Sequence, residues 1–73
     1  MLPYRISDGI HRTLDIYAST DVIRRIYSWV DKSFSKKEIF PVYCMYFVQV
    51  RFSDEEKIAG FKKGLSEKFA PTA

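Results

Sequence analysis

The chain has 73 residues, which is the size of one small domain and leaves no room for a second core. Hydrophobic residues make up 47% of it and charged residues 29%, so intrinsic disorder of the whole chain is excluded. Twelve Lys and Arg against nine Asp and Glu give a formal net charge of +3, a modest excess that does not by itself indicate a nucleic-acid partner.

The cysteine count and the apolar runs bear on the compartment. Cys44 is the single cysteine, so no intrachain disulfide can form, although a small secreted domain would usually need such bridges. Residues 1–5 lack the basic-then-apolar order of a signal peptide. The longest apolar run, residues 42–48, is much shorter than the ~20 residues that span a bilayer. We therefore expect a soluble, cytoplasmic protein without a membrane partner.

The chain begins with a pattern typical of a hairpin. Residues 2–6 alternate apolar and polar side chains, which predicts a half-buried strand. A second strand is expected from residue 10 to about residue 18. A three-residue loop at 7–9 pairs Ile6 with Ile10 and places the apolar side chains of both strands on one face. This geometry predicts a left-handed Gly9 and a bulge that close the loop.

Residues 19–21 (Ser-Thr-Asp) supply capping oxygens and an early acid, and the apolar spacing after them predicts a helix that extends to about Ser33. The longest strand is then expected at residues 39–52, with Pro41 near its start indicating an edge position or a late start of pairing. The even-numbered residues of this strand are expected in the core, and its odd-numbered residues on the open face.

A second helix follows residues 53–56 (Ser-Asp-Glu-Glu), which resemble a capping box in which Ser53 and Glu56 cap each other. Pro71 ends this helix and leaves residues 71–73 as a flexible tail. The predicted order is ββαβα within a single domain over residues 1–70. The fold class is therefore α+β: a two-layer sandwich of a three-stranded, mainly antiparallel sheet, its first strand central, with two helices on one face.

The sequence offers little for catalysis or metal binding. Cys44 is predicted on the core face and His11 on the open face, so they cannot form a nucleophile–base pair. Four strand residues, or roughly 13 Å, separate His11 from Asp15. One His and one Cys fall short of a zinc set, and no glycine-rich phosphate loop is present. We expect no enzyme, no metal, no cofactor and no small-molecule substrate.

The second predicted helix contains two glycines, Gly60 and Gly64. Each costs ~1 kcal/mol relative to alanine in a helix interior. We favour close packing against the sheet or the other helix as the reason for them. A flat contact surface for a partner is the alternative.

The open sheet face is the most informative predicted feature. Aromatic residues make up 16% of the chain, which is more than a core this small can hide. The candidate partner-binding residues on this face are Tyr17, Tyr43, Met45, Phe47, Arg5 and Arg51. Such residues are enriched in the cores of protein interfaces, and they also form stacking platforms for single-stranded nucleic acid. The chain's own tail could also cover the face.

The basic residues of the two helices form a second candidate set. Four of them are possible basic contacts for nucleic acid: Arg24, Arg25, Lys62 and Lys63. Acidic residues nearby dilute these groups, so an ordinary solvated helix face is the favoured interpretation.

Residues 46–56 resemble the third strand and following helix of the RNA recognition motif family, in which an aromatic-rich strand leads into an acidic helix start. The likeness covers about a dozen residues. It lacks the strand glycines of that family, and the predicted order departs from βαββαβ. The family's binding residues are therefore not carried over to this chain.

The interpretation that follows is a non-enzymatic protein-binding module of a regulatory or inhibitory kind. Its partner would be another protein or a second copy of the chain, which would make a homodimer. The binding site would be the open sheet face together with the edge of the strand at residues 39–52. The alternative is a nucleic-acid-binding domain that stacks single strands on the same face.

Overall fold

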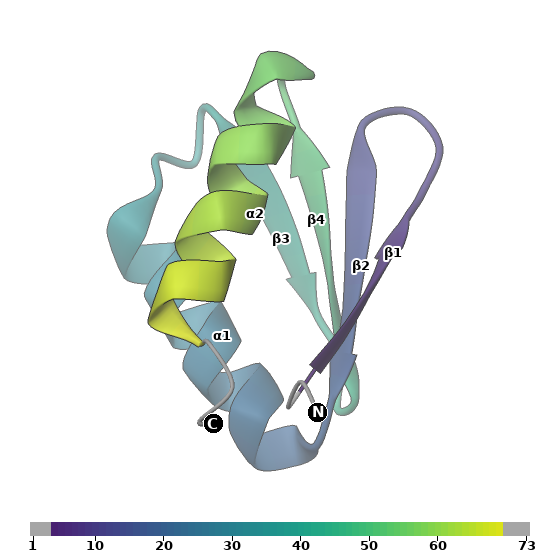
Figure 1. The fold of residues 1–73 in the computed structure, drawn as a ribbon, viewed down its shortest axis with the longest axis vertical. Helices are drawn as coiled ribbons and strands as arrows, with labels where there is room; N and C mark the ends of the chain where they lie inside the picture. Colours follow the sequence, from purple (N-terminus) through teal and green to yellow (C-terminus); the bar gives the residue numbers. More distant parts are fainter. Residues whose placement is uncertain (1–3, 70–73) are drawn as a thin grey trace.

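The computed structural model describes residues 4–69 and shows an α+β domain in the order ββαββα (Figure 1). The predicted fold class is confirmed at this level. The predicted tail at 71–73 and the start of the first predicted strand lie outside the described residues. The elements are β1 (Tyr4–Asp8), β2 (Thr13–Ala18), α1 (Thr20–Ser33), β3 (Ile39–Tyr43), β4 (Phe47–Phe52) and α2 (Glu56–Lys68).

The sheet has four strands, in the order β1-β2-β4-β3, and every neighbouring pair is antiparallel. The prediction of three strands with the first one central was wrong. Instead β2 and β4 are central, while β1 and β3 form the edges. Both helices lie on the same side of this sheet (Figure 1), which leaves its other side as the open face.

The additional strand arises because the predicted strand over residues 39–52 is a hairpin. A single strand of that length would extend about 46 Å at 3.3 Å per residue, whereas the longest dimension of the molecule is 32 Å. The chain reverses at Met45 and Tyr46, between the closing pair Cys44 and Phe47, where the Cys44 N–H donates to the Phe47 carbonyl oxygen at 2.8 Å.

The reversal also exchanges the faces. Tyr43 pairs with Val48 and Val42 with Gln49, so odd-numbered residues of β3 share the helix-covered side with even-numbered residues of β4. Val42 and Tyr43 were therefore predicted on the wrong sides.

The first hairpin keeps its predicted face but not its register. Ile6 pairs with Ile16 rather than with Ile10, and residues 9–12 form the loop. The shift is even-numbered, so the apolar side chains of both strands still share one face. Gly9 is not left-handed. The residues with positive φ are His11 and Arg12, and Ile10, which was predicted in the strand, is 77% exposed in the loop.

The core lies between the sheet and the helices. Apolar periodicity correctly predicts most of its side chains, which come from every strand and both helices: Tyr4, Leu14, Ile16, Ile23, Ile26, Val30, Ile39, Val48, Val50, Phe52, Phe61 and Leu65. Removing this much apolar surface from water is the main stabilising term for a domain without disulfides.

The start of α2 differs from the predicted capping box. The N-cap position is Glu55, without a side-chain capping bond. The Glu56 N–H donates to Oδ1 of Asp54 at 3.1 Å, and Ser53 takes no part. Of the two glycines, Gly64 packs as predicted, because a Cβ there would lie 3.3 Å from Cζ2 of Trp29 on α1. Gly60 does not, since a Cβ there would meet nothing within 4 Å.

Neither helix among residues 4–69 has the length and apolar character needed to cross a membrane.

Candidate protein-binding surface

The largest concentration of exposed apolar side chains lies on the edge strand β3 and the turn that follows it. Met45 is 64% exposed and Phe40 is 49% exposed. We call this set the β3 surface, and its members are Phe40, Val42, Tyr43, Met45 and Tyr46. Ile10 is also exposed, but it stands alone in the β1–β2 loop at the opposite end of the sheet (Figure 1). Single exposed apolar residues are ordinary, whereas five of them within residues 40–46 indicate an interaction site.

The β3 surface carries no charge. No residue from Ile39 to Val50 is ionisable as an acid or base near neutral pH, apart from the thiol of Cys44. Edge strands of monomeric proteins usually carry charged side chains, which prevent association with other chains. This edge therefore lacks the usual protection at the level of its side chains.

The backbone of β3, by contrast, lacks a hydrogen-bond donor at the middle of its open edge. Alternate residues of an antiparallel pair bond to the neighbouring strand. The N–H of Cys44 and the carbonyl of Glu38 both bond to the β4 side, so the odd-numbered residues of β3 direct their backbone groups toward the open edge. Pro41 is the central one of these and has no N–H. An added strand would lack a donor there, so the β3 surface is suited to side-chain contacts rather than strand addition.

The turn of the β3 surface is held in place by the backbone. Besides the bond from Cys44 to Phe47, the N–H of Ala18 at the end of β2 donates to the carbonyl oxygen of Tyr46 at 3.2 Å. Tyr43 is fixed from the helix side, since its ring centroid lies 5.3 Å from that of Tyr27 on α1. The exposed side chains are thus presented on a fixed backbone, which lowers the entropic cost of binding.

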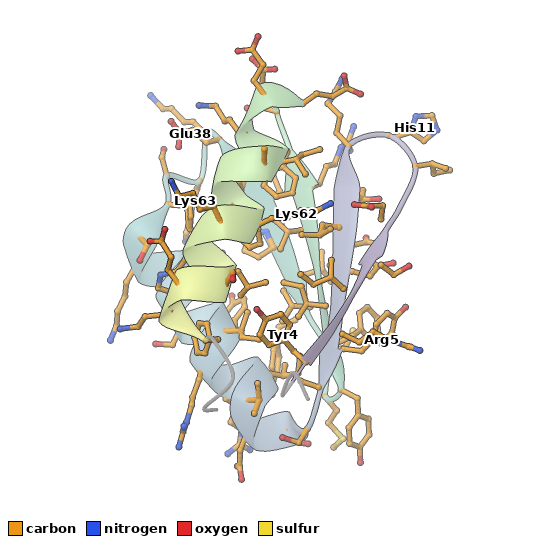
Figure 2. The ribbon with its side chains drawn as sticks, viewed as in Figure 1. Tyr4, Arg5, His11, Glu38, Lys62 and Lys63 are labelled. Atoms are coloured by element: carbon orange, nitrogen blue, oxygen red, sulfur yellow. The ribbon has the colours of Figure 1, made fainter. Side chains whose placement is uncertain are left out.

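The open face brings together three of the predicted binding residues. Arg5 lies over the ring of Tyr17, with 4.8 Å between its Cζ and the ring centroid. The ring of Phe47 follows at 5.7 Å from that of Tyr17. Figure 2 shows Arg5 directed away from the helices, while Tyr4, next to it in sequence, points toward them. These three side chains form one row across β1, β2 and β4.

The other predicted binding residues lie elsewhere. Arg51 is on the open face but at its far end, where it pairs with Thr13 and Phe40. Met45 is in the turn, and Tyr43 is on the helix-covered side. The single aromatic patch predicted from the sequence is therefore divided, and Phe40, Val42 and Tyr46 were missed as exposed members of it.

A polar row separates the two ends of the open face. Ser7 pairs with Asp15, and Asp15 pairs with Gln49. Oδ1 of Asp15 is buried and has no hydrogen-bond partner among the described residues. A carboxylate at the centre of the face opposes the approach of a phosphate backbone.

The structure places the four predicted basic contacts in different surroundings. Lys62 is paired with Asp8 on β1, with 2.9 Å between Nζ and Oδ1. Lys63 is exposed on the outer side of α2 (Figure 2). Arg24 and Arg25 instead line a groove between α1 and the end of α2.

The candidate catalytic residues are far apart. His11 is at the tip of the β1–β2 loop (Figure 2), whereas Cys44 is half-buried at the β3–β4 turn. The prediction of Cys44 on the core face was wrong, because the turn places it on the open-face side with Phe47. Burial raises the pKa of the Tyr4 phenol, but Tyr4 belongs to the core. Within residues 4–69, no group of three or more His, Cys, Asp or Glu side chains could hold a metal ion.

No protein-family model, no curated protein and no solved structure matches the chain. The geometry of the molecule therefore carries the functional argument.

Sequence reasoning missed part of the β3 surface for a traceable reason. Residues 44–47 (Cys-Met-Tyr-Phe) contain none of the Gly, Pro, Asn or Asp residues that mark turns. The length of the predicted strand was the remaining indication of a turn, because strands of globular proteins usually have about 5–6 residues. A stretch of 14 residues ought to have been divided, and the division would have moved Phe40 and Val42 to the open face.

Proposed function

We propose that this chain is a small, non-enzymatic protein-binding module that acts through the β3 surface. The observation that carries the proposal is the combination of uncharged, exposed apolar side chains with a rigid edge strand. Such a surface is unfavourable in water and contributes little to the fold, so its burial by a partner is the simplest role for it.

The partner contacts side chains rather than the strand edge, because Pro41 removes the central donor. Phe40 and Val42 extend the contact onto the open face of β3. Phe47, which follows the turn, extends it toward Tyr17. Met45 and Tyr46 project beyond the sheet and are suited to fill recesses in the partner. Aromatic residues and methionine at the centre of an interface supply most of its binding free energy.

A protein partner is favoured over nucleic acid at this site. The side chains of the β3 surface are themselves uncharged, with Arg51 opposite Phe40 as a neighbouring cation, and Asp15 lies in the middle of the adjoining open face. Arg5 is already engaged with the ring of Tyr17. Because Cys44 is a free thiol, we include the reducing cytoplasm in the proposal as the compartment in which the chain acts.

The test compares the wild-type chain with a Phe40→Ser/Met45→Ser double variant. Light scattering after size exclusion measures self-association, and immobilised protein captures partners from a lysate of the parent organism. Ile10→Ser is the control, since it removes an exposed apolar side chain from the β1–β2 loop, outside the β3 surface. Denaturant unfolding of each variant establishes that it folds.

We expect the double variant to lose the dimer or the captured protein by about tenfold or more, as for two residues at an interface centre. Ile10→Ser should retain it. Association that survives the double change, or that Ile10→Ser removes equally, would contradict the proposal. A monomeric chain that captures no protein would contradict it as well.

A further inference from the structure

A groove of about 670 Å³ lies between α1 and the C-terminal end of α2, on the opposite layer from the open sheet face. Its size is within the range of ligand-binding pockets in proteins. Side chains of both helices line it: Arg24, Arg25, Ser28, Trp29, Lys32, Ser33, Lys68 and Phe69. Four of these eight residues are cations, two carry hydroxyl groups, two are aromatic and none is acidic.

The four cations are not neutralised by ion pairs within the part of the chain that the structure describes. The ion pairs formed there join Lys57 to Glu38 and Lys62 to Asp8, and neither involves a residue of the groove. The end of α2 contributes a partial negative charge of about half a unit, which the four full charges outweigh. The lining of the groove is therefore positive, and Asp31 and Glu67, which adjoin Lys32 and Lys68 in sequence, are not among its lining residues.

The aromatic lining residues of the groove are Trp29 and Phe69, which we call its aromatic floor. Phe34 and Phe69 meet the indole of Trp29 edge-on, with centroids at 5.2 and 5.8 Å. Gly64 lies directly against its six-membered ring. These contacts hold the half-buried indole in one orientation while part of it lines the groove.

We propose that this groove binds single-stranded nucleic acid. Each nucleotide combines a phosphate with a flat base, and the groove combines guanidinium and ammonium groups with an aromatic floor. Arginine forms bidentate bonds with phosphate oxygens, and Ser28 and Ser33 supply hydroxyl groups that can donate to the same oxygens.

The cations are spaced for more than one phosphate. Arg24 and Lys32 are eight residues apart on α1, or about 12 Å at 1.5 Å per residue, and Lys68 approaches from the other helix. An acidic peptide would also satisfy the cations. It carries no flat ring at each residue, however, so the aromatic floor favours nucleic acid. This site is separate from the β3 surface, and either site can exist without the other.

Trp29 provides a local reporter, because it is the single tryptophan of the chain. We would titrate the full chain with a strand of about ten thymidines, which is within the usual site sizes of such proteins, and follow the fluorescence of Trp29. We expect quenching and an affinity that falls with salt. The slope of log K against log[salt] should be about −2 to −3, from about −0.7 for each of three or four phosphates.

The decisive variant is Arg24→Gln/Arg25→Gln, which should weaken binding and reduce the slope by about 1.4. Lys37→Gln/Lys63→Gln removes the same charge from exposed positions outside the groove and should leave the slope unchanged. Thymidine monophosphate and an oligoglutamate peptide of matched charge serve as comparison ligands, and both should bind more weakly than the strand.

Three results would overturn the proposal. One is the absence of quenching by the strand at low salt. Another is oligoglutamate binding as tightly as the strand, which would assign the groove to an acidic protein segment. The third is an equal loss of binding in both double variants, which would show that only the total charge matters.

Discussion

Two groups of large apolar side chains in this molecule have opposite surroundings. Around Phe61, the rings of Trp29, Phe34 and Phe52 lie with centroids 5.2 to 5.4 Å away, and they join both helices to the sheet. Along the β3 surface, Phe40, Met45 and Tyr46 are largely exposed to solvent. The first group stabilises the fold. The second contributes little to it, which is why we assign its role to binding.

The two groups also differ in electrostatic setting. The Phe61 group borders the basic groove through Trp29, whereas the β3 surface lies in an uncharged stretch of the chain. A small domain thus presents two chemically distinct surfaces, one apolar and one cationic, on opposite sides of a shared core. Substitutions in the two groups test whether buried side chains stabilise the fold while exposed ones do not.

The largest expected effect is that of Phe61→Ala. Phe61 is 1% exposed, and truncating a buried phenylalanine typically costs about 3–5 kcal/mol. Small domains have roughly 5–15 kcal/mol of stability in total, so this variant should be close to unfolding at 37 °C. Phe40→Ala should change the free energy of unfolding by less than about 0.5 kcal/mol. Urea unfolding followed by circular dichroism measures both, and equal losses would remove the distinction.

A smaller effect is expected from the two glycines of α2. Gly60→Ala should stabilise the protein by up to about 1 kcal/mol, because alanine favours the helix and nothing opposes its Cβ. Gly64→Ala should gain less or lose stability, since its Cβ would press on Trp29. The same unfolding assay measures both variants. An equal gain at the two positions would mean that α2 does not pack against Trp29 as described.

The smallest effect concerns Tyr4 at alkaline pH. Burial raises the pKa of its phenol, so above about pH 10 the unfolded chain releases this proton before the folded chain does. The free energy of unfolding should therefore fall as the pH rises through that range, and Tyr4→Phe should remove part of the fall. Urea unfolding between pH 8 and 11 compares Tyr4→Phe with the wild type, and identical pH dependences for the two would contradict the burial of the Tyr4 phenol.

Alternation of apolar residues was sufficient to predict the central strands. Leu14 and Ile16 in β2, and Val48 and Val50 in β4, are all buried as their spacing indicated. Residues 39–43 could not be assigned in this way, because apolar side chains occupy both faces of β3 and periodicity then has no face to select. The turn at Met45 depends on tertiary packing, which requires the chain to reverse within a small core.

The candidate sites were predictable to different degrees. Sequence reasoning correctly grouped Arg5, Tyr17 and Phe47 on one face, because each occupies an odd-numbered position of its strand. The groove could not be predicted, because it depends on how closely Lys68 and Phe69 at the end of α2 approach the Arg24 side of α1. That approach is set by packing between two helices, α1 ending at Ser33 and α2 beginning at Glu56, that are not adjacent in the chain.

Site-specific photocrosslinking in cells of the parent organism tests the central claim most directly. A photoreactive phenylalanine analogue replaces Met45 in one variant and Ile10 in another, so that each probe occupies an exposed apolar position at one end of the sheet. We predict a discrete protein adduct from position 45 and none from position 10. An adduct from position 10 alone, or none from either position, would contradict the assignment of the β3 surface as the protein-binding site.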